Sequence, residues 1–403
     1  MTPAPDSPAS KASAIEKIRN RFPGTSLRAH LDVASRSLIP ASAQEIAASH
    51  LAERINGVID KDRYFGLVEH ARRSFAMMIN ASSAEVAITK NVSEGLNIVA
   101  TSINWDCGDE VFLCSDIEHP NNVYTWRNLE HRGVVVRDFP ARAGLFPIDD
   151  VIDALQKSSR ARVVTVSATS FKPGFRTDLD ALSKACRAVG AYLVVDGAQS
   201  AGITHTDVER TGIDALAVST QKGLCSLYGM GFLYVRKEFA ETLIPSQLAR
   251  FGVTIDATHE ADYDPGPIHY RPGALRFDVG NYNFLAAALV GSSLDMLLSV
   301  GTEAIDQHVT ALASSLAHQL IAAGLPVIWP EGALSANMVC IDMAKDPLAA
   351  ASLQRYLQEN QVQAAVRRNL LRFSIHVYNN ESDIDAAAAV TKRWADQRRA
   401  STT

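Results

Sequence analysis

The chain has 403 residues, 47% hydrophobic and 21% charged, and its 39 basic and 44 acidic residues leave a net charge of −5. At about 150 residues per domain this length predicts two or three domains, and the charge argues against nucleic acid or an anionic membrane as the main partner. The five cysteines are scattered and form no C-x-x-C pair, which excludes a disulfide framework and a zinc ribbon and indicates a reducing compartment.

Neither end of the chain suggests a targeting or membrane segment. Residues 1–12 are rich in proline, serine and alanine, without a basic start followed by an apolar stretch, so we expect a frayed tail rather than a signal peptide. The longest apolar run, 284–290, is too short to span a bilayer. The sequence therefore predicts a soluble, cytoplasmic protein.

From about residue 85 to 236, short β-branched runs alternate with helical patterns. The expected buried strands are 163–166, 191–195, 216–218 and 232–235. Apolar residues at helical spacing predict a helix over 179–189 that ends at Gly190. Strands alternating with helices indicate crossover connections and a mostly parallel sheet, so the predicted fold class is α/β.

The pattern changes after residue 250. Residues 251–280 show no clear period and predict a long, functional or disordered loop. Helices are expected at 284–300, 303–323, 348–359 and from 382, with strands at 336–341 and 371–375. We therefore predict a large domain over 25–283 and a smaller α+β domain over 284–403, with residues 1–24 as a tail and a segment packing on the small domain.

Two polar groups follow neighbouring predicted strands. Asp196 ends one apolar run, and the run 216–218 leads to Lys222. Open α/β sheets bind ligands at the carboxyl edge of the strands, where both side chains would lie. A desolvated lysine can form a Schiff base and an acid can pair with a pyridinium nitrogen, so the pair suits pyridoxal phosphate (PLP). If each residue is considered alone, the sequence is equally explained by an Asp196 that caps a turn and by a Lys222 that lies on the surface.

A phosphate site is predicted at residues 89–95, which lead into an apolar face at helical spacing. Free N–H groups and the dipole at a helix start suit a phosphate, with Asn91 and Ser93 as side-chain donors. Ordinary N-capping by either side chain explains the same pattern.

From about residue 22 to 380 the sequence resembles the class V, fold-type I PLP enzymes: cysteine desulfurases, selenocysteine lyases and isopenicillin N epimerase-like proteins. The matching segments, in the family's order, are 31–34, 91–97, 118–122, 174–179, 196–199, 219–222, 229–234 and 371–374. The resemblance implies an aspartate aminotransferase-like fold, with a mostly parallel seven-stranded sheet between helices in the large domain.

The resemblance also implies roles for individual residues. Lys222 would form the Schiff base with PLP and move the substrate α-proton, Asp196 would keep the pyridine nitrogen protonated, and His119 would stack on the ring. The other expected cofactor contacts are Val92, Ser93, Gln199, Ser219 and Gln221. No metal site is expected.

Substrate and subunit contacts follow from the same resemblance. Arg372 would bind the substrate carboxylate as a two-pronged fork. Ala34 and Asn122 are further candidates for substrate contacts. For the substrate side chain the candidates are Arg36, Arg176 and tyrosine or histidine residues of 251–280, each of which an ordinary surface position explains as well. In the family a Gly-Thr pair of the neighbouring subunit reaches the phosphate; the aligned Gly280-Asn281 keeps an amide donor but lacks the hydroxyl. We therefore expect a homodimer with the site at the subunit interface, and a cofactor contact from Gly280 and Asn281.

Two departures from the desulfurase pattern bear on the reaction. The stretch 365–372 lacks the loop that carries the nucleophilic cysteine, and the nearest cysteine, Cys340, lies in an apolar run. Persulfide chemistry needs a thiolate near the substrate. Gln221 precedes the lysine where desulfurases have a histidine, and a glutamine can only form hydrogen bonds.

These departures favour a reaction that Lys222 runs largely alone on an amino acid. We expect a transaminase or an epimerase-like enzyme first, with a carbon–sulfur or other β-lyase as the alternative. A PLP-binding protein without turnover is disfavoured because Lys222, Asp196 and Arg372 are all present. An NAD enzyme is disfavoured because no G-x-G-x-x-G follows an early strand.

Overall fold

The computed structural model describes residues 8–255 and 263–400. Its largest sheet has seven strands in the order β2-β8-β7-β6-β5-β3-β4. All strands run in the same direction except β8, which is antiparallel to both of its neighbours, β2 and β7. The strands are β2 (Val86–Thr89), β3 (Glu110–Leu113), β4 (Val135–Asp138), β5 (Ala161–Ser167), β6 (Tyr192–Asp196), β7 (Ala215–Ser219) and β8 (Gly231–Val235). The predicted α/β fold with a mostly parallel sheet is confirmed.

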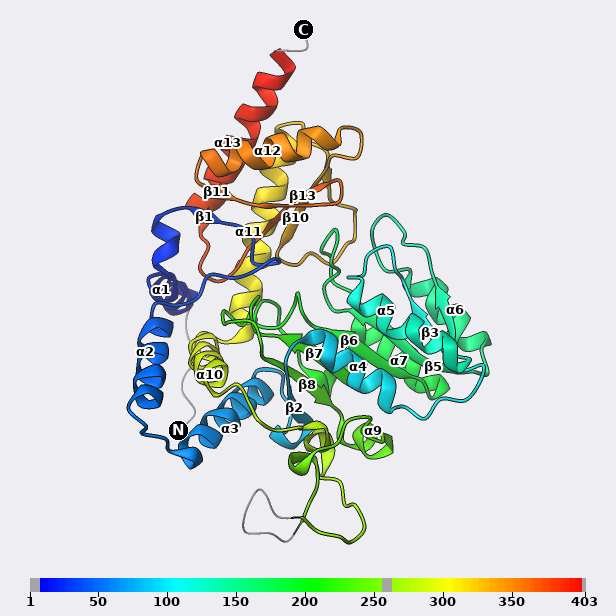
Figure 1. Cartoon of the computed structure of the whole chain (residues 1–403). Coiled ribbons are helices and arrows are strands. Elements are labelled where there is room, and N and C mark those ends of the chain that lie inside the picture. Colours follow the sequence, from blue (N-terminus) through cyan, green and yellow to red (C-terminus); the bar gives the residue numbers. More distant parts are fainter. Residues whose placement is uncertain (1–7, 256–262, 401–403) are drawn as a thin grey trace.

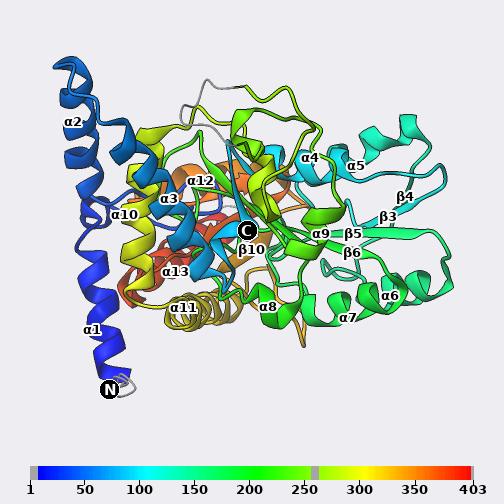
Figure 2. The same ribbon diagram turned by 90° about the horizontal axis from the view of Figure 1, so that it is seen from below.

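Helices cover both faces of this sheet, which is why its central strands are mostly apolar and almost entirely buried. Figure 2 shows α4 (Val92–Ser102) and α5 (Asn121–Arg127) on one side, and α6 (Ile148–Lys157), α7 (Leu179–Val189) and α8 (Val208–Thr211) on the other. As predicted, α7 ends at Gly190, which adopts the left-handed conformation (φ 75°) that favours glycine.

A second, smaller group of elements forms the upper part of Figure 1. Its antiparallel sheet has the order β12-β13-β10-β9. These strands are β9 (Val327–Ile328), β10 (Met338–Asp342), β12 (Ala365–Arg367) and β13 (Leu370–Ser374). The helices of this part are α11 (Thr302–Ala322), α12 (Pro347–Glu359) and α13 (Glu381–Ala400), close to their predicted positions.

The N-terminal segment joins the small domain. Arg19, at the end of α1 (Pro8–Arg19), forms a salt bridge of 2.7 Å with Asp383 of α13, and β1 (Ala29–His30) pairs in parallel with β11 (Val362–Gln363). Arg19 thus contacts the small domain, while the division of the chain at residue 24 stays a prediction. The frayed tail is wrong for residues 8–12, which lie in α1; residues 1–7 lie outside the described residues.

The boundary predicted at 283/284 also needs correction. The helix α10 (Phe284–Leu298) packs chiefly against α3 (Lys61–Met78), beside the large sheet. It buries residues such as Val290 and Leu294 there. Its apolar surface therefore belongs to the large domain, and the change of domain comes at Gly301, between α10 and α11. No single described helix is long and apolar enough to cross a membrane; α10 and α11 pass that test only jointly, as a pair bent by 79°.

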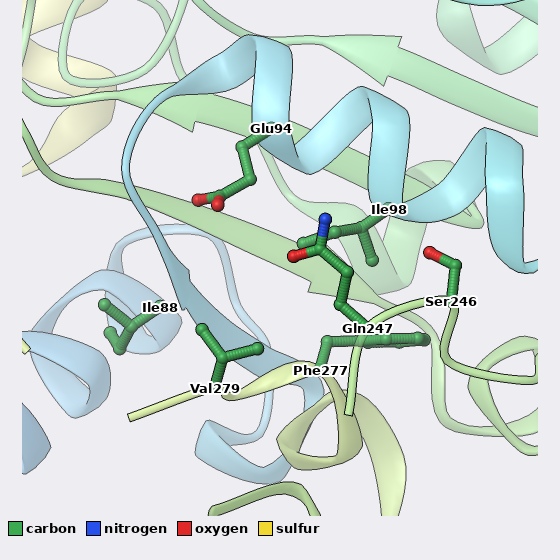
Figure 3. Close-up of a pocket in the computed structure, with 7 residues that line it drawn as sticks. All are labelled: Ile88, Glu94, Ile98, Ser246, Gln247, Phe277 and Val279. Carbon is green, nitrogen blue, oxygen red and sulfur yellow. The ribbon is translucent and has the colours of Figure 1, made fainter. Parts of the chain in front are cut away.

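The predicted loop 251–280 is irregular, with two short 3-10 helices, η4 (Arg250–Gly252) and η5 (Gly273–Phe277); residues 256–262 lie outside the described residues. Asp278, fully buried, anchors its end by a 2.7 Å salt bridge to Arg72 and accepts a hydrogen bond from the Ile88 amide. Figure 3 shows how Phe277 and Val279 approach α4 around a small hollow. This loop therefore packs beside the helix predicted to bind phosphate.

Candidate active site

A cavity of about 370 Å³ lies at the carboxyl edge of the large sheet. β6 ends at Asp196 and β7 at Ser219, so parallel pairing brings both ends to one edge, with Lys222 three residues further on. The predicted residues that line the cavity are Ala34, Asn91, Val92, Ser93, His119, Asp196, Gln199, Ser219, Gln221 and Lys222. One cavity thus collects most of the site proposed from sequence.

The Lys222 amine and the Asp196 carboxylate are electrostatically coupled. Burial lowers the pKa of Lys222 from 10.5 to about 8; Asp196 opposes this shift, while Arg372 and Arg367 add to it. Burial raises the pKa of Asp196, which is 4% exposed, against the effects of a 2.8 Å hydrogen bond from the Ala198 amide and the charge of Lys222. The lysine can therefore become a neutral nucleophile near neutral pH.

The start of α4 forms one end of the cavity. Asn91 caps the helix by accepting a hydrogen bond from the Glu94 amide, and the Asn121 side chain donates to Ser93 Oγ over 2.6 Å. Asn91 is thus an N-cap, as one explanation predicted. The first turn of α4 also begins at the cavity, so its free amides are available to an anion, and phosphate binding stays a prediction. The Ser219 hydroxyl is buried without a hydrogen-bond partner among the described residues. These groups are suited to bind an anion.

His119 and Gln199 lie on the walls between these ends. The His119 ring meets Phe171 edge-to-face at 4.9 Å, and burial lowers its pKa, with help from Lys222. A neutral imidazole can stack on an aromatic ring. Gln199 donates to the Ala34 carbonyl at 3.1 Å, which leaves its buried Oε1 without a partner in the described part of the chain.

Arg372, in β13, is fully buried behind the cavity and does not line it. Its Nη1 donates to the Phe171 carbonyl at 3.0 Å, and its guanidinium carbon lies 5.4 Å from the centroid of the Phe171 ring, which does line the cavity. Nε and Nη2 have no partner among the described residues, and burial lowers the pKa to about 10. Two unpaired donors on a buried cation leave room for an anion such as a carboxylate.

Three expected substrate contacts are placed elsewhere. Asn122 is fully buried behind the cavity, donates to Glu118 and accepts from Trp126 and Thr165, so its amide is occupied by the protein. Arg36 is exposed and does not line the cavity. Arg176 forms a bidentate salt bridge with Asp306 and donates a hydrogen bond to the Ser335 carbonyl, so it links the two domains.

Gly280 and Asn281 do not line the cavity of this chain either. Both have positive φ, 79° and 50°, and a Cβ on Gly280 would lie 2.0 Å from a ring carbon of Phe251. Glycine is therefore required at 280 for close packing. The contact of this pair with a neighbouring subunit remains a prediction.

The cysteines are absent from the cavity lining. Cys340 pairs with Arg372 in the β10–β13 register, is 1% exposed, and donates to the Pro173 carbonyl at 3.2 Å. Burial raises its pKa to about 12, so the thiolate is strongly disfavoured. In place of the desulfurase loop, β12 and β13 form a hairpin with Arg368 and Asn369 at its turn.

The structure adds cavity residues that the sequence argument missed: Ser35, Asn121, Ser167, Phe171, Tyr228 and Arg367. Glu118 lies behind them, accepting hydrogen bonds from the amide and hydroxyl of Ser167, and burial raises its pKa to about 7. Glu118 could have been found from the sequence, because it begins the family-matching segment 118–122. Arg367 had a weaker signal, since only four residues lie between it and Arg372.

The cavity suits PLP by its donor set. The α4 amides and Ser219 Oγ could bind the phosphate, and Lys222 could react with the aldehyde. Asp196 could pair with the pyridine nitrogen, and His119 could stack on the ring. Two atoms without a hydrogen-bond partner among the described residues, Ser219 Oγ and Gln199 Oε1, belong to residues that line this cavity. Among the described residues no group of three or more His, Cys, Asp or Glu could hold a metal ion.

Comparison with known proteins finds relatives that span most of the chain. The uncharacterized aminotransferase YcbU of Bacillus subtilis is 29% identical over 388 residues, which cover 93% of this chain and 98% of YcbU. A probable cysteine desulfurase of Methanothermobacter thermautotrophicus is 30% identical over 300 residues, 73% of this chain and 72% of the relative.

Solved structures share the fold at lower identity. The cysteine desulfurase CsdA of Escherichia coli superposes with a TM-score of 0.82 at 20% identity, covering 95% of this chain and 98% of CsdA. A C-DES mutant with glycine covalently linked to its PLP cofactor superposes with a TM-score of 0.83 at 23% identity, covering 93% of this chain and 98% of the C-DES chain. The aminotransferase class-V family model matches residues 49–387. The chain therefore belongs to the aminotransferase class-V family and is a PLP-dependent enzyme.

Proposed function

We propose that this enzyme removes the α-proton of an amino acid with Lys222 and completes a transamination or an epimerisation. The observation that carries this proposal is a cavity with a buried lysine of lowered pKa beside a buried aspartate, and without a cysteine in its lining. PLP, when bound, supplies the electron sink for the carbanion.

The side chains divide the work. Lys222 holds the cofactor and then, as an amine, takes and returns the α-proton. Asp196 keeps a proton on the ring nitrogen, and His119 holds the ring face. Arg372 binds the substrate carboxylate when the Phe171 ring moves aside. Its two unpaired donors belong to a guanidinium whose carbon lies 5.4 Å from the centroid of that ring.

A desulfurase reaction through a cysteine nucleophile is disfavoured, although several relatives carry that name. A β-lyase needs no nucleophilic cysteine and is therefore the alternative; the neighbour C-DES, described as a cystine C–S lyase, has this fold. Transamination yields a keto acid and epimerisation the inverted amino acid, whereas β-elimination yields a released β-group together with pyruvate.

The lysine assignment can be tested by borohydride reduction of the holoenzyme followed by peptide mapping. We expect the fixed cofactor on Lys222 and its loss in Lys222→Ala. Lys172→Ala is the matched control, because burial lowers the pKa of Lys172 as well but that residue does not line the cavity. An unchanged adduct in Lys222→Ala would overturn the assignment.

The reaction can be identified with a panel of amino acids, incubated with and without a keto acid acceptor. Keto acid and new amino acid that appear only with the acceptor indicate transamination, inverted stereochemistry indicates epimerisation, and pyruvate or sulfide without an acceptor indicates a lyase. Sulfide production abolished by Cys340→Ala would instead revive the desulfurase.

We also propose that the enzyme is a cytoplasmic homodimer with its site at the subunit interface. The helix α2 (Ser42–Ile55) has no buried residue, and its Leu51 and Ile55 are 53% and 82% exposed; Figure 2 shows it at the edge of the molecule. Tyr228 lines the cavity yet is 60% exposed. A second copy would cover these side chains, and light scattering tests for a mass of twice 43.6 kDa.

A further inference from the structure

Arg367 is the arginine that lines the cavity itself. Its Nη2 donates to Ser35 Oγ at 2.5 Å and its Nη1 to the Val366 carbonyl at 2.9 Å. Ser35 Oγ in turn donates to Asp32, so a carboxylate supports the arginine through a hydroxyl. No described carboxylate forms a direct salt bridge with Arg367, although arginine is the residue best suited to bind one bidentately.

The hairpin register places Arg367 and Arg372 together. Ala365 lies opposite Arg372, and Arg367 is two residues along the same strand, so both arginines lie on one face of the sheet as a diagonal pair. Such pairs have backbones about 7–8 Å apart, close enough for two long side chains to hold one small molecule. Two like charges placed so closely repel each other unless an anion lies between or beside them.

The charges around the cavity are unbalanced at this end. Lys222 and Arg367 line the cavity with a single lining carboxylate, Asp196, and Arg372 lies behind Phe171. Asp32 reaches Arg367 only through Ser35 Oγ, and the phosphate site lies at the start of α4. A substrate with one carboxylate would compensate one arginine and leave the other unpaired. A substrate with two anionic groups compensates both.

We propose that the substrate is an amino acid with an acidic side chain, whose α-carboxylate binds Arg372 and whose second acidic group binds Arg367. This inference rests on the proposed function and deepens it by naming the substrate class. Arg367 would select for the second acidic group, whereas Lys222, Asp196 and His119 would act at Cα whatever the side chain.

The test titrates the PLP-loaded enzyme with unreactive carboxylates and follows the absorbance of the cofactor. Succinate and glutarate are compared with propionate and butyrate at constant pH and ionic strength. We expect the dicarboxylates to bind about tenfold more tightly or better, the effect of one further charged hydrogen bond. Absence of this preference in the unaltered enzyme would overturn the proposal.

The variants assign the preference to a residue. Arg367→Gln should weaken dicarboxylate binding far more than monocarboxylate binding and so remove the preference, and Arg367→Lys should keep part of it. Arg368→Gln is the matched control, since Arg368 is the exposed neighbour at the turn and does not line the cavity. Equal weakening of both ligand classes by Arg367→Gln would show that Arg367 binds the α-carboxylate alone and would refute the proposal.

The borohydride experiment distinguishes failure of this inference from failure of the proposed function. Failure to form a Lys222 adduct would remove the proposed function and this inference together. A normal adduct without dicarboxylate preference would refute this inference alone.

Discussion

Replacing Arg372 by glutamine tests the carboxylate site. The substitution removes the two guanidinium donors, Nε and Nη2, that have no partner among the described residues. A hydrogen bond to a charged group contributes about 1.5–3 kcal/mol, so two such bonds represent about 3–6 kcal/mol. Displacing the Phe171 ring and its carbonyl from the arginine offsets part of this energy. We therefore expect a loss of about 100- to 1,000-fold in amino acid affinity.

The assay is the change in cofactor absorbance on titration with amino acids, with Arg372→Lys as the conservative comparison. Lysine keeps the charge but not the fork, so it should recover only part of the affinity. Burial lowers the pKa of Arg372 to about 10, which means that burying this charge destabilises the folded protein. Arg372→Gln should therefore leave the unfolding temperature unchanged or higher. Unchanged amino acid affinity in the folded, PLP-loaded variant would refute the assignment.

Three further predictions concern groups outside the cavity lining. Cys340→Ala should keep kcat/KM within about twofold and lower stability by about 1 kcal/mol, as for a small core truncation; an inactive but folded variant would contradict this. Burial lowers the pKa of His376 from 6.5 to about 4, so the unfolded chain binds one more proton between these pH values. The unfolding free energy should thus fall by about 3 kcal/mol as the pH drops from 6.5 to 4. His376→Asn should flatten that dependence in urea titrations, and an unaltered slope would exclude His376 as its source. Arg72→Met should cost about 3–5 kcal/mol because it leaves the fully buried Asp278 unpaired, and the double variant with Asp278→Leu should recover most of that loss in the same titrations.

The sequence pattern alone determined the large domain and the centre of the site. The alternation of apolar strands and helices specifies a parallel sheet, and a parallel sheet brings every strand's carboxyl end to one edge. Asp196 at the end of β6 and Lys222 just after β7 therefore had to meet, whatever the remaining packing. The start of α4 followed in the same way from a polar turn before an apolar helical face.

Tertiary structure decided the parts that depend on contacts distant in sequence. The apolar face of α10 could have packed on either domain, and only its contact with α3 shows that it belongs to the large one. Asn122 looks like a substrate ligand in its motif, but its amide is occupied by Glu118, Trp126 and Thr165. Period and spacing give no information on such partners.

The two arginines of the β12–β13 hairpin show this division most clearly. The sequence showed a missing loop before Arg372 and hence a cavity without a cysteine. It did not show that the short turn would bring Arg367 onto the same face, because one residue of register would have turned that side chain away. The order of strands and helices along the chain determined which residues surround the cofactor. The register of the β12–β13 hairpin determined which arginines lie near the substrate.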